Sequence, residues 1–298
     1  MRSARTNAIL HLMLLPAVLF TFVFSYIPMG GIVIAFQNFI PAKGLFGDQV
    51  WNGLDNFKYL LSLPSFLSAL RNTLIIALSK MMLGLAVPIM VSLLLNEAGG
   101  KYFKRSIQTI IYLPHFISWV VLAGIFIEML SPSSGIINKV LKVLDIEPIF
   151  FLGSNTWFRP TIIITDSWKN FGFSTIIYVA AISGVDPGLY ESALMDGAGR
   201  IRQAFNITIP CISSTIILLS VLSMGNILNA GFDQIFNLYN PIVYQSGDIF
   251  DTFVYRMGIV QAQYGVATAA GLFKSAVSSV FICLSYFLSF RLAGYRIF

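Results

Sequence analysis

Apolar residues run along this chain in six long stretches that are separated by polar segments. The stretches cover about residues 8–36, 72–96, 106–130, 160–185, 207–232 and 262–290. Each can cross the hydrocarbon core of a bilayer, which takes about 20 mostly apolar residues in a helix. The runs are continuous rather than alternating, so they predict helices and not the strands of a membrane barrel. We therefore expect an all-α polytopic membrane protein with six transmembrane helices in one domain, residues 1–298.

The composition supports this interpretation. Hydrophobic residues make up 56% of the chain and charged residues 11%, whereas soluble domains carry about 25% charged residues. So few charges cannot cover a water-facing surface, which excludes a soluble enzyme. Cys211 and Cys283 lie within apolar stretches and are expected to be small buried side chains. The net charge of +6 then bears on membrane orientation, and we expect no nucleic-acid partner.

The distribution of basic residues predicts that orientation. Six spans place both termini on one side, together with the segments 97–105 and 186–202. This side carries nine Lys and Arg in 41 residues, Arg296 among them, and the opposite loops carry seven in 82. Because basic residues concentrate on the cytoplasmic side, we expect both termini in the cytoplasm.

The sequence contains no pattern of a catalytic or metal site. It has no phosphate-binding loop, no His-Glu-x-x-His and no Gly-x-Ser-x-Gly. The two histidines, His11 and His115, stand in apolar neighbourhoods, where packing or hydrogen bonding is the simplest role. We expect no catalytic residue and no metal ligand.

The polar segment at about residues 186–206 contains more structure than a connector needs. Asp186 followed by Pro187 is typical of an N-cap and a first helical position. Gly197 and Gly199 are expected to end the helix that starts there.

This short helix carries Glu191 and Asp196, and Pro210 marks the start of the next span. A helix on the membrane surface either transmits force to a soluble partner or rests on lipid headgroups. The residue types alone leave both roles open.

A longer motif in this segment distinguishes the two roles. It consists of Glu191, Ser192, Ala193, Gly197, Ile207, Ile209 and Pro210. This spacing resembles the EAA loop of ABC importer permeases, Glu-Ala-Ala, three residues, Gly, nine residues and Ile-x-Leu-Pro, with mild departures at Ser192 and Ile209. In that family the loop forms a coupling helix that docks on an ATPase subunit. The resemblance implies coupling roles for Asp186, Pro187, Glu191, Ala193, Asp196, Gly197 and Pro210.

Four other segments resemble the carbohydrate-uptake branch of these permeases. They are residues 26–39, 112–119, 232–241 and 263–275, and they are most similar to permeases for complex oligosaccharides such as alginate. The resemblance implies the type I ABC importer permease fold in a bacterial inner membrane. It also implies a second permease subunit, two cytoplasmic ATPase subunits and an extracytoplasmic binding protein. ATP and magnesium would bind to the ATPase subunits, and no cofactor to this chain.

Charged residues within the spans are candidates for the transport pathway. A charge at the bilayer centre costs at least about 2.5–3.5 kcal/mol, so it normally faces a cavity or a partner. Asp166 and Lys169 are three residues apart and could neutralise one another. Lys80 and Lys274 have no evident local partner, so they could line the pathway and favour an anionic, uronate-type cargo. Snorkelling, or pairing with the second permease, explains them equally well.

Sugar sites also need amide groups and aromatic faces. The candidate wall residues are Trp168, Asn170, Asn226, Asn229 and Gln234. Each could instead form a hydrogen bond between helices.

Three other functions remain as alternatives to oligosaccharide import. The importer could carry a peptide or another polar solute. A carrier driven by an ion gradient would need paired broken helices in related halves, which the sequence does not show. An intramembrane enzyme is disfavoured by the missing catalytic cluster.

Overall fold

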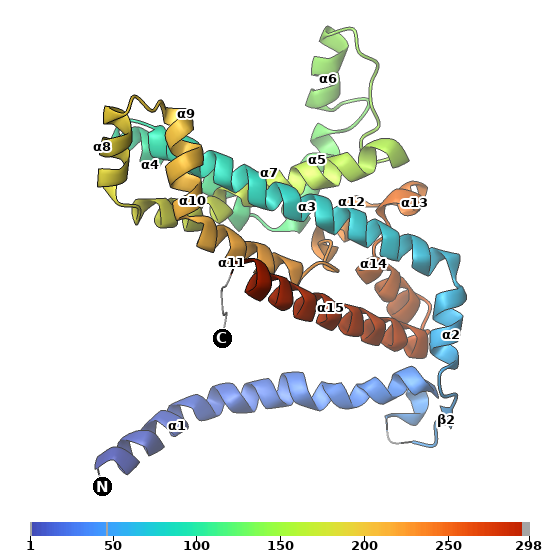
Figure 1. Ribbon diagram of the computed structural model, residues 1–298. Coiled ribbons are helices and arrows are strands. Elements are labelled where there is room, and N and C mark those ends of the chain that lie inside the picture. Colours follow the sequence, from blue (N-terminus) through green and yellow to red (C-terminus); the bar gives the residue numbers. More distant parts are fainter. Residues whose placement is uncertain (1, 46, 294–298) are drawn as a thin grey trace. The chain divides into compact units, whose positions relative to one another are not determined.

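The computed structural model describes residues 2–45 and 47–293 and is almost entirely helical (Figure 1). Arg296, which entered the charge comparison, lies outside the described residues. The contacts divide the chain into two compact units, one of Met1–Pro64 with Val254–Ser275 and one of Ser65–Phe253 with Ala276–Phe298. A single membrane domain over residues 1–298 stays a prediction.

The first unit starts with one long helix. α1 (Arg2–Thr21) continues through a π-helical turn, η1 (Phe22–Tyr26), into a 3₁₀ segment, η2 (Ile27–Phe36). The elements that follow in this unit are β1 (Gln37–Asn38), η3 (Pro41–Lys43), β2 (Val50–Trp51), α2 (Asp55–Ser62), η7 (Arg256–Val260) and the first part of α15 (Tyr264–Ala293).

The side-chain amide of Asn56 joins α2 to the end of η2 and to β1 in the first unit. The two strands pair antiparallel with Gln37 opposite Trp51. Asn56 Nδ2 of α2 donates hydrogen bonds to the carbonyls of Ala35, at 2.9 Å, and Gln37, at 3.0 Å. A Cβ atom on Gly265 would lie 2.6 Å from the same nitrogen. The start of α15 therefore packs closely against α2 and the hairpin.

The second unit contains most of the helices. Apart from end residues of α3 and α14, it holds α3 (Pro64–Glu97), α4 (Lys101–Tyr112), η4 (Leu113–Phe116), α5 (Trp119–Met129), α6 (Ile136–Val143), α7 (Asn155–Ser183), α8 (Pro187–Met195), α9 (Arg200–Gln203), η5 (Ala204–Thr208), α10 (Ile209–Cys211), α11 (Ser213–Met224), α12 (Phe232–Leu238), η6 (Pro241–Val243), α13 (Tyr244–Gly247), α14 (Phe250–Tyr255) and the rest of α15. In Figure 1, α4, α8 and α9 lie at one end of this unit and α13 at the other.

The predicted spans correspond to helices, but not all of them are straight. Within the described residues, three helices are long and apolar enough to cross a membrane, namely His11–Phe36, Pro64–Glu97 and Tyr264–Phe287. Three bent pairs of helices raise the number of candidate spans to as many as six.

The third predicted span, 106–130, is wrong as one continuous helix. α4 with η4 and α5 meet at an angle of 101°. Pro114 lacks a backbone N–H, Ile117 is extended, and the Ser118 hydroxyl caps α5 by accepting from the Val121 N–H at 3.4 Å. The chain therefore ends one helix and starts another within this apolar run.

The fifth predicted span, 207–232, also has the wrong shape. Its helix bends by 63° after Cys211 and ends at Met224, short of the predicted boundary. Turns follow up to Gly231, which adopts a φ of +90°. The asparagines in this segment favour turns because their side chains compete for backbone hydrogen bonds. Hydrophobicity alone did not reveal this break.

Two apolar clusters hold the second unit together. In one, Ile76 of α3, Phe158 and Ile162 of α7 and Ile235 of α12 are fully buried. In the other, Tyr178 of α7 packs with Ile182 and Ile212. Between helices in a membrane such clusters act through close van der Waals packing, because lipid is as apolar as these side chains. These clusters fix α7 against α3 and against the segments that follow it.

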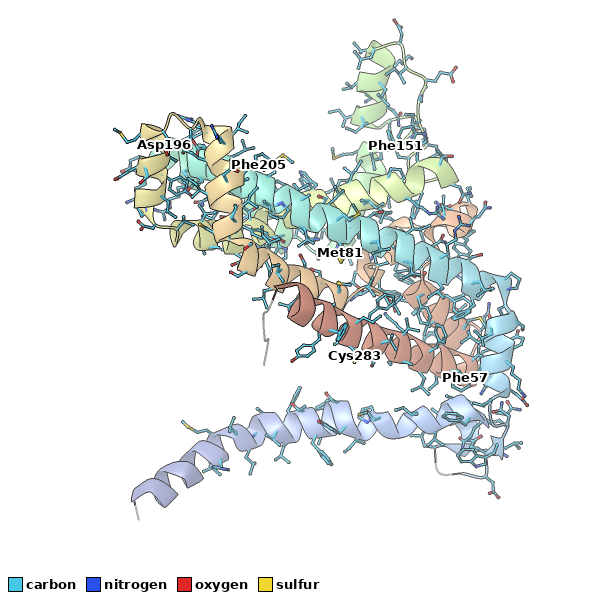
Figure 2. All side chains as sticks on the ribbon, viewed as in Figure 1. Phe57, Met81, Phe151, Asp196, Phe205 and Cys283 are labelled. Carbon is cyan, nitrogen blue, oxygen red and sulfur yellow. The ribbon has the colours of Figure 1, made fainter. Side chains whose placement is uncertain are left out.

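The two cysteines correct an expectation. Both Cys211 and Cys283 are exposed rather than buried, and Cys283 lies on α15 (Figure 2). An apolar surface can stay exposed on a membrane helix because lipid is as apolar as the side chain. An apolar stretch therefore does not imply burial within the protein.

Candidate functional site

The second unit contains a polar cavity of about 390 Å³ between α3, α7 and the turns after α11. The residues that line it are Ala77, Lys80, Met81, Gly84, Asp166, Ser174, Ser223, Asn226, Ile227, Asn229, Ala230 and Gly231. Of the predicted pathway residues, Lys80, Asp166, Asn226 and Asn229 lie together here. Hydroxyl, amide and carboxylate groups inside a membrane chain provide hydrogen bonds for a polar solute.

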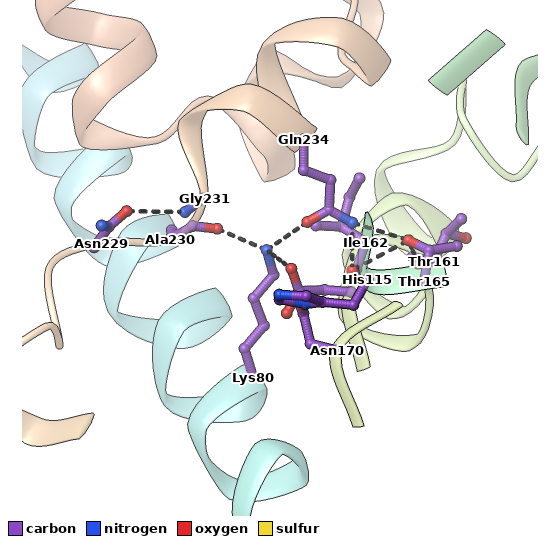
Figure 3. A network of polar contacts seen from close by, with 11 residues as sticks. Lys80, His115, Thr161, Ile162, Thr165, Asn170, Asn229, Ala230, Gly231 and Gln234 are labelled. Atoms are coloured by element: carbon purple, nitrogen blue, oxygen red, sulfur yellow. Dashed lines mark hydrogen bonds and ion pairs between the residues drawn. The ribbon is translucent and has the colours of Figure 1, made fainter. Parts of the chain in front are cut away.

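An ion pair crosses the wall of this cavity. Lys80 Nζ lies 3.4 Å from Asp166 Oδ1, and the side chains are 9% and 22% exposed. The same ammonium donates to the Ala230 carbonyl at 2.7 Å and to Gln234 Oε1 (Figure 3). Lys80 thereby links α3 to α7 and to the turn before α12. Its charge is neutralised within the protein.

Gln234 of α12 forms hydrogen bonds to the two helices, α3 and α7, that carry Lys80 and Asp166. It is fully buried, and its Nε2 donates to the Ile162 carbonyl at 2.8 Å and to Thr165 Oγ1 at 2.9 Å. All the polar atoms of this amide thus have partners on α3 or α7. Gln234 joins helices here and does not line the cavity.

The turn that closes the cavity depends on a glycine. Gly231 has a positive φ, and a Cβ atom there would lie 2.9 Å from Lys80 Nζ. Asn229 Oδ1 accepts from the Gly231 N–H at 3.3 Å. A residue without a side chain lets the backbone approach the ammonium.

Asp166 and Lys169, which the sequence left open as a neutralising pair, form no ion pair among the described residues. Asp166 pairs with Lys80 from α3, and Lys169 Nζ donates to the His115 carbonyl at 2.6 Å and the Pro114 carbonyl at 3.5 Å. At the bend between α4 and α5 the Pro114 carbonyl accepts from the Ile117 N–H at 3.2 Å, and inside a membrane the His115 carbonyl needs a donor from the protein. Lys169 satisfies that need.

Three other candidates lie away from the cavity lining. His115 Nδ1 and Asn170 Oδ1 are 3.1 Å apart, and the imidazole stacks on Phe173 with ring centroids at 4.1 Å. Trp168 packs edge-to-face on Phe126. Lys274 belongs to the part of α15 in the first unit. Trp168 and Asn170 therefore have packing and hydrogen-bonding partners in the described structure.

The segment after α7 forms the predicted short helix with both predicted ends. Asp186 Oδ1 accepts from the Gly188 N–H at 2.9 Å, and Pro187 is the first residue of α8. At the other end Gly197 has a φ of +73°, and the Ala198 N–H donates to the Ala193 carbonyl at 2.8 Å. This is a Schellman cap, which requires the left-handed conformation.

The free surface of α8 is apolar at its tip. The predicted residues Glu191, Asp196 and Gly197 are exposed, and Asp196 stands at the end of α8 in Figure 2. Leu194 and Met195 are 63% and 89% exposed, and they were missed as candidates. The signal was two adjacent large apolar residues in a helix outside the spans. Such side chains, next to charges, are typical of a docking surface.

Two side-chain contacts hold this segment to the elements around it. Tyr190 Oη lies 2.9 Å from the buried Thr208 Oγ1. Arg200 Nε lies 3.4 Å from Glu97 Oε2 at the end of α3. Pro210, the last residue of the motif, lies in α10 and is exposed. These contacts join α8 to η5, in the segment that leads to Asn226, and α9 to the end of α3.

Among the described residues, no group of three or more His, Cys, Asp or Glu side chains is placed so that it could hold a metal ion.

Known proteins are similar to this chain over nearly its whole length. Residues 80–294 match the family described as binding-protein-dependent transport system inner membrane component. Protein LplB of Bacillus subtilis is 42% identical over 95% of this chain and 88% of its own length. The polygalacturonan/rhamnogalacturonan transport system permease protein YteP of the same organism is 43% identical over 93% and 86%.

A solved structure is similar in fold as well as in sequence. A chain of a bacterial alginate ABC transporter, crystallised with an alginate pentasaccharide-bound periplasmic protein, matches with a TM-score of 0.89. It is 38% identical, and the match covers 98% of this chain and 97% of that chain.

Proposed function

The chain belongs to the family of binding-protein-dependent transport system inner membrane components, and on this premise we propose that it forms one part of the membrane pathway of an ATP-driven oligosaccharide importer. The observation that carries the proposal is the polar cavity, whose wall on α7 leads directly into α8. A second permease subunit would complete the pathway, and an extracytoplasmic binding protein would deliver the cargo.

The orientation follows from the proposed partners. α8 faces the cytoplasm, where one of the two ATPase subunits binds its exposed tip, and both termini lie on that side of a bacterial inner membrane. α8 follows α7 at an angle of 72° and contacts η5 through Tyr190 and Thr208. ATP and magnesium act on the ATPase subunits, and this chain transmits their movement. Cargo or nucleotide can shift the equilibrium between two conformations of the pathway only by the difference in its affinity for them.

The cargo that we propose is an acidic oligosaccharide. YteP is named for polygalacturonan and rhamnogalacturonan, and the similar solved transporter holds an alginate-bound partner. The charge of Lys80 is neutralised by its ion pair with Asp166. We therefore assign Lys80 to positioning Asp166 rather than to attracting the anionic cargo. Asn226 and Asn229 supply amide groups for sugar hydroxyls.

ATP-driven uptake tests this function. The chain is reconstituted with its partner permease, ATPase and binding protein in liposomes, and the uptake of labelled oligogalacturonides, alginate oligosaccharides, maltotriose and a tripeptide is measured. We expect uptake of the oligogalacturonides and alginate oligosaccharides, and not of maltotriose, with ATP, and no uptake with a non-hydrolysable analogue. The variant Asn226→Leu is expected to raise the KM about tenfold through one lost hydrogen bond. Asn237→Leu, outside the cavity lining, is the matched control and should leave the KM unchanged.

Two results would contradict the proposal. Uptake driven by an ion gradient without ATP would indicate a secondary carrier. Uptake of the tripeptide and of no oligosaccharide would replace the proposed cargo.

A further inference from the structure

A second polar cavity, of about 370 Å³, lies in the same unit where the first turns of α3 and α7 meet α13. Its lining contains two arginines, three amides and three hydroxyl groups, and no acidic residue. These residues are Ser68, Arg71, Asn72, Asn155, Thr156, Arg159, Gln245 and Ser246. The cavity is thus cationic and rich in neutral hydrogen-bonding groups.

One of the arginines is held rigidly. Arg159 Nη2 donates to Asn72 Oδ1 at 2.6 Å, and its Nε donates to the Ser246 carbonyl at 3.0 Å. Asn72 is itself buried and donates to the carbonyls of Gln245 and Asp248. A guanidinium has five N–H donors, so three of those on Arg159 remain for a ligand.

Neither arginine has an acidic partner. Among the ion pairs of the described residues, none includes Arg71 or Arg159. Arg71 is exposed and Arg159 is half-buried. Two cations that share a cavity without a counter-charge favour an anion, and a planar guanidinium matches a carboxylate with two parallel hydrogen bonds.

The cavity lies at the far end of α7 from the coupling segment. Arg159 is about 36 Å from Ser183 along the helix axis, since each residue adds about 1.5 Å. Asp166 of the central cavity follows Arg159 by two turns, or about 10 Å, on the same face of α7. A solute that enters opposite α8 would therefore reach the arginine cavity before the central one.

We propose that this cavity is a carboxylate-recognition subsite, which binds a uronate residue of the incoming oligosaccharide. The inference rests on the proposed function, an oligosaccharide importer, and adds the group that selects acidic cargo. The arginines bind the carboxylate, and the amide and hydroxyl side chains bind the sugar hydroxyls. Its volume falls within the range of about 300–1,000 Å³ for ligand cavities. A site with six neutral polar side chains around two arginines fits a sugar acid better than a lone carboxylate of a docked protein.

Equilibrium dialysis with the assembled permease and ATPase complex, without binding protein, tests the subsite. The probes are labelled trigalacturonate and the same trisaccharide with its carboxyl groups reduced to alcohols. We expect Arg71→Gln to weaken trigalacturonate binding about tenfold and carboxyl reduction to weaken binding to the wild type about tenfold. Arg71→Gln should then distinguish the two probes less than the wild type does, because both changes weaken the same interaction and only Arg159 remains to bind the carboxylate.

Lys142→Gln is the matched control, since Lys142 is an exposed cation of α6 outside the cavity. It should bind trigalacturonate as the wild type does. Equal losses in Arg71→Gln and Lys142→Gln would indicate a general charge effect and overturn the subsite.

The remaining outcomes separate the inference from the function on which it rests. If the wild-type importer takes up oligosaccharides and Arg71→Gln binds trigalacturonate normally, the subsite is wrong and the proposed function stands. If Arg71→Gln weakens only the docking of the binding protein, the arginines recognise a protein carboxylate instead, and the subsite is also wrong. If the wild type imports no oligosaccharide, the proposed function itself fails.

Discussion

Replacing Lys80 with methionine is expected to lower the free energy of unfolding by about 3 kcal/mol, because Asp166 would keep a largely buried charge without its partner. The two side chains are only 9% and 22% exposed, so solvent screens the pair weakly. The loss would also remove the donor to Ala230 and Gln234. SDS titration of the purified protein in detergent, followed by circular dichroism, measures the change.

The double variant Lys80→Met with Asp166→Leu is the control for this prediction. Removing both charges leaves no unpaired ion, and apolar replacements of buried ion pairs are often neutral. We expect the double variant to regain most of the lost stability, but not cargo uptake. A single variant as stable as the wild type would show that the ion pair does not hold the cavity wall.

Gly172→Ala is expected to cost about 3 kcal/mol, the second large effect. A Cβ atom at this position would overlap the Ile111 carbonyl of α4, and backbone atoms cannot rotate away. Overpacking of this kind typically costs about 1–3 kcal/mol, and here it would separate α7 from α4. The same SDS titration measures the loss.

Gly124→Ala is the matched substitution. Gly124 also lies in an apolar helix, α5, but a Cβ atom there would meet nothing within 4 Å. Alanine favours a helix by up to about 1 kcal/mol over glycine, so this variant should be unchanged or slightly more stable. Equal losses in both variants would argue against close packing as the cause.

Local signals in the sequence predicted both ends of the short helix α8. An Asp-Pro pair and a glycine at the right spacing specified where α8 begins and ends, since caps depend on residues within one turn. The all-α fold and the family resemblance were confirmed by the structure and the comparisons. The roles assigned to Glu191, Ala193 and Gly197 stay predictions.

Contacts between segments far apart in the chain could not be predicted from the sequence. Asp166 has Lys169 one turn away, yet it pairs with Lys80 on another helix. Lys169 instead donates to the carbonyls of Pro114 and His115 at the bend between α4 and α5. A hydropathy profile is averaged over many residues, so it does not reveal bends of this kind. The arginine cavity was missed for the same reason, because its residues come from three separate segments.

The central claim is that α8 is the surface through which an ATPase drives this chain. Met195→Asp places a charge on the 89% exposed tip of α8, and Val143→Asp does the same on the 84% exposed end of α6. The direct measurement is co-purification of the ATPase subunits with each variant, together with ATP hydrolysis in response to loaded binding protein. The account predicts that Met195→Asp loses ATPase binding and stimulation while Val143→Asp retains ATPase binding. Full binding and stimulation in Met195→Asp would contradict it.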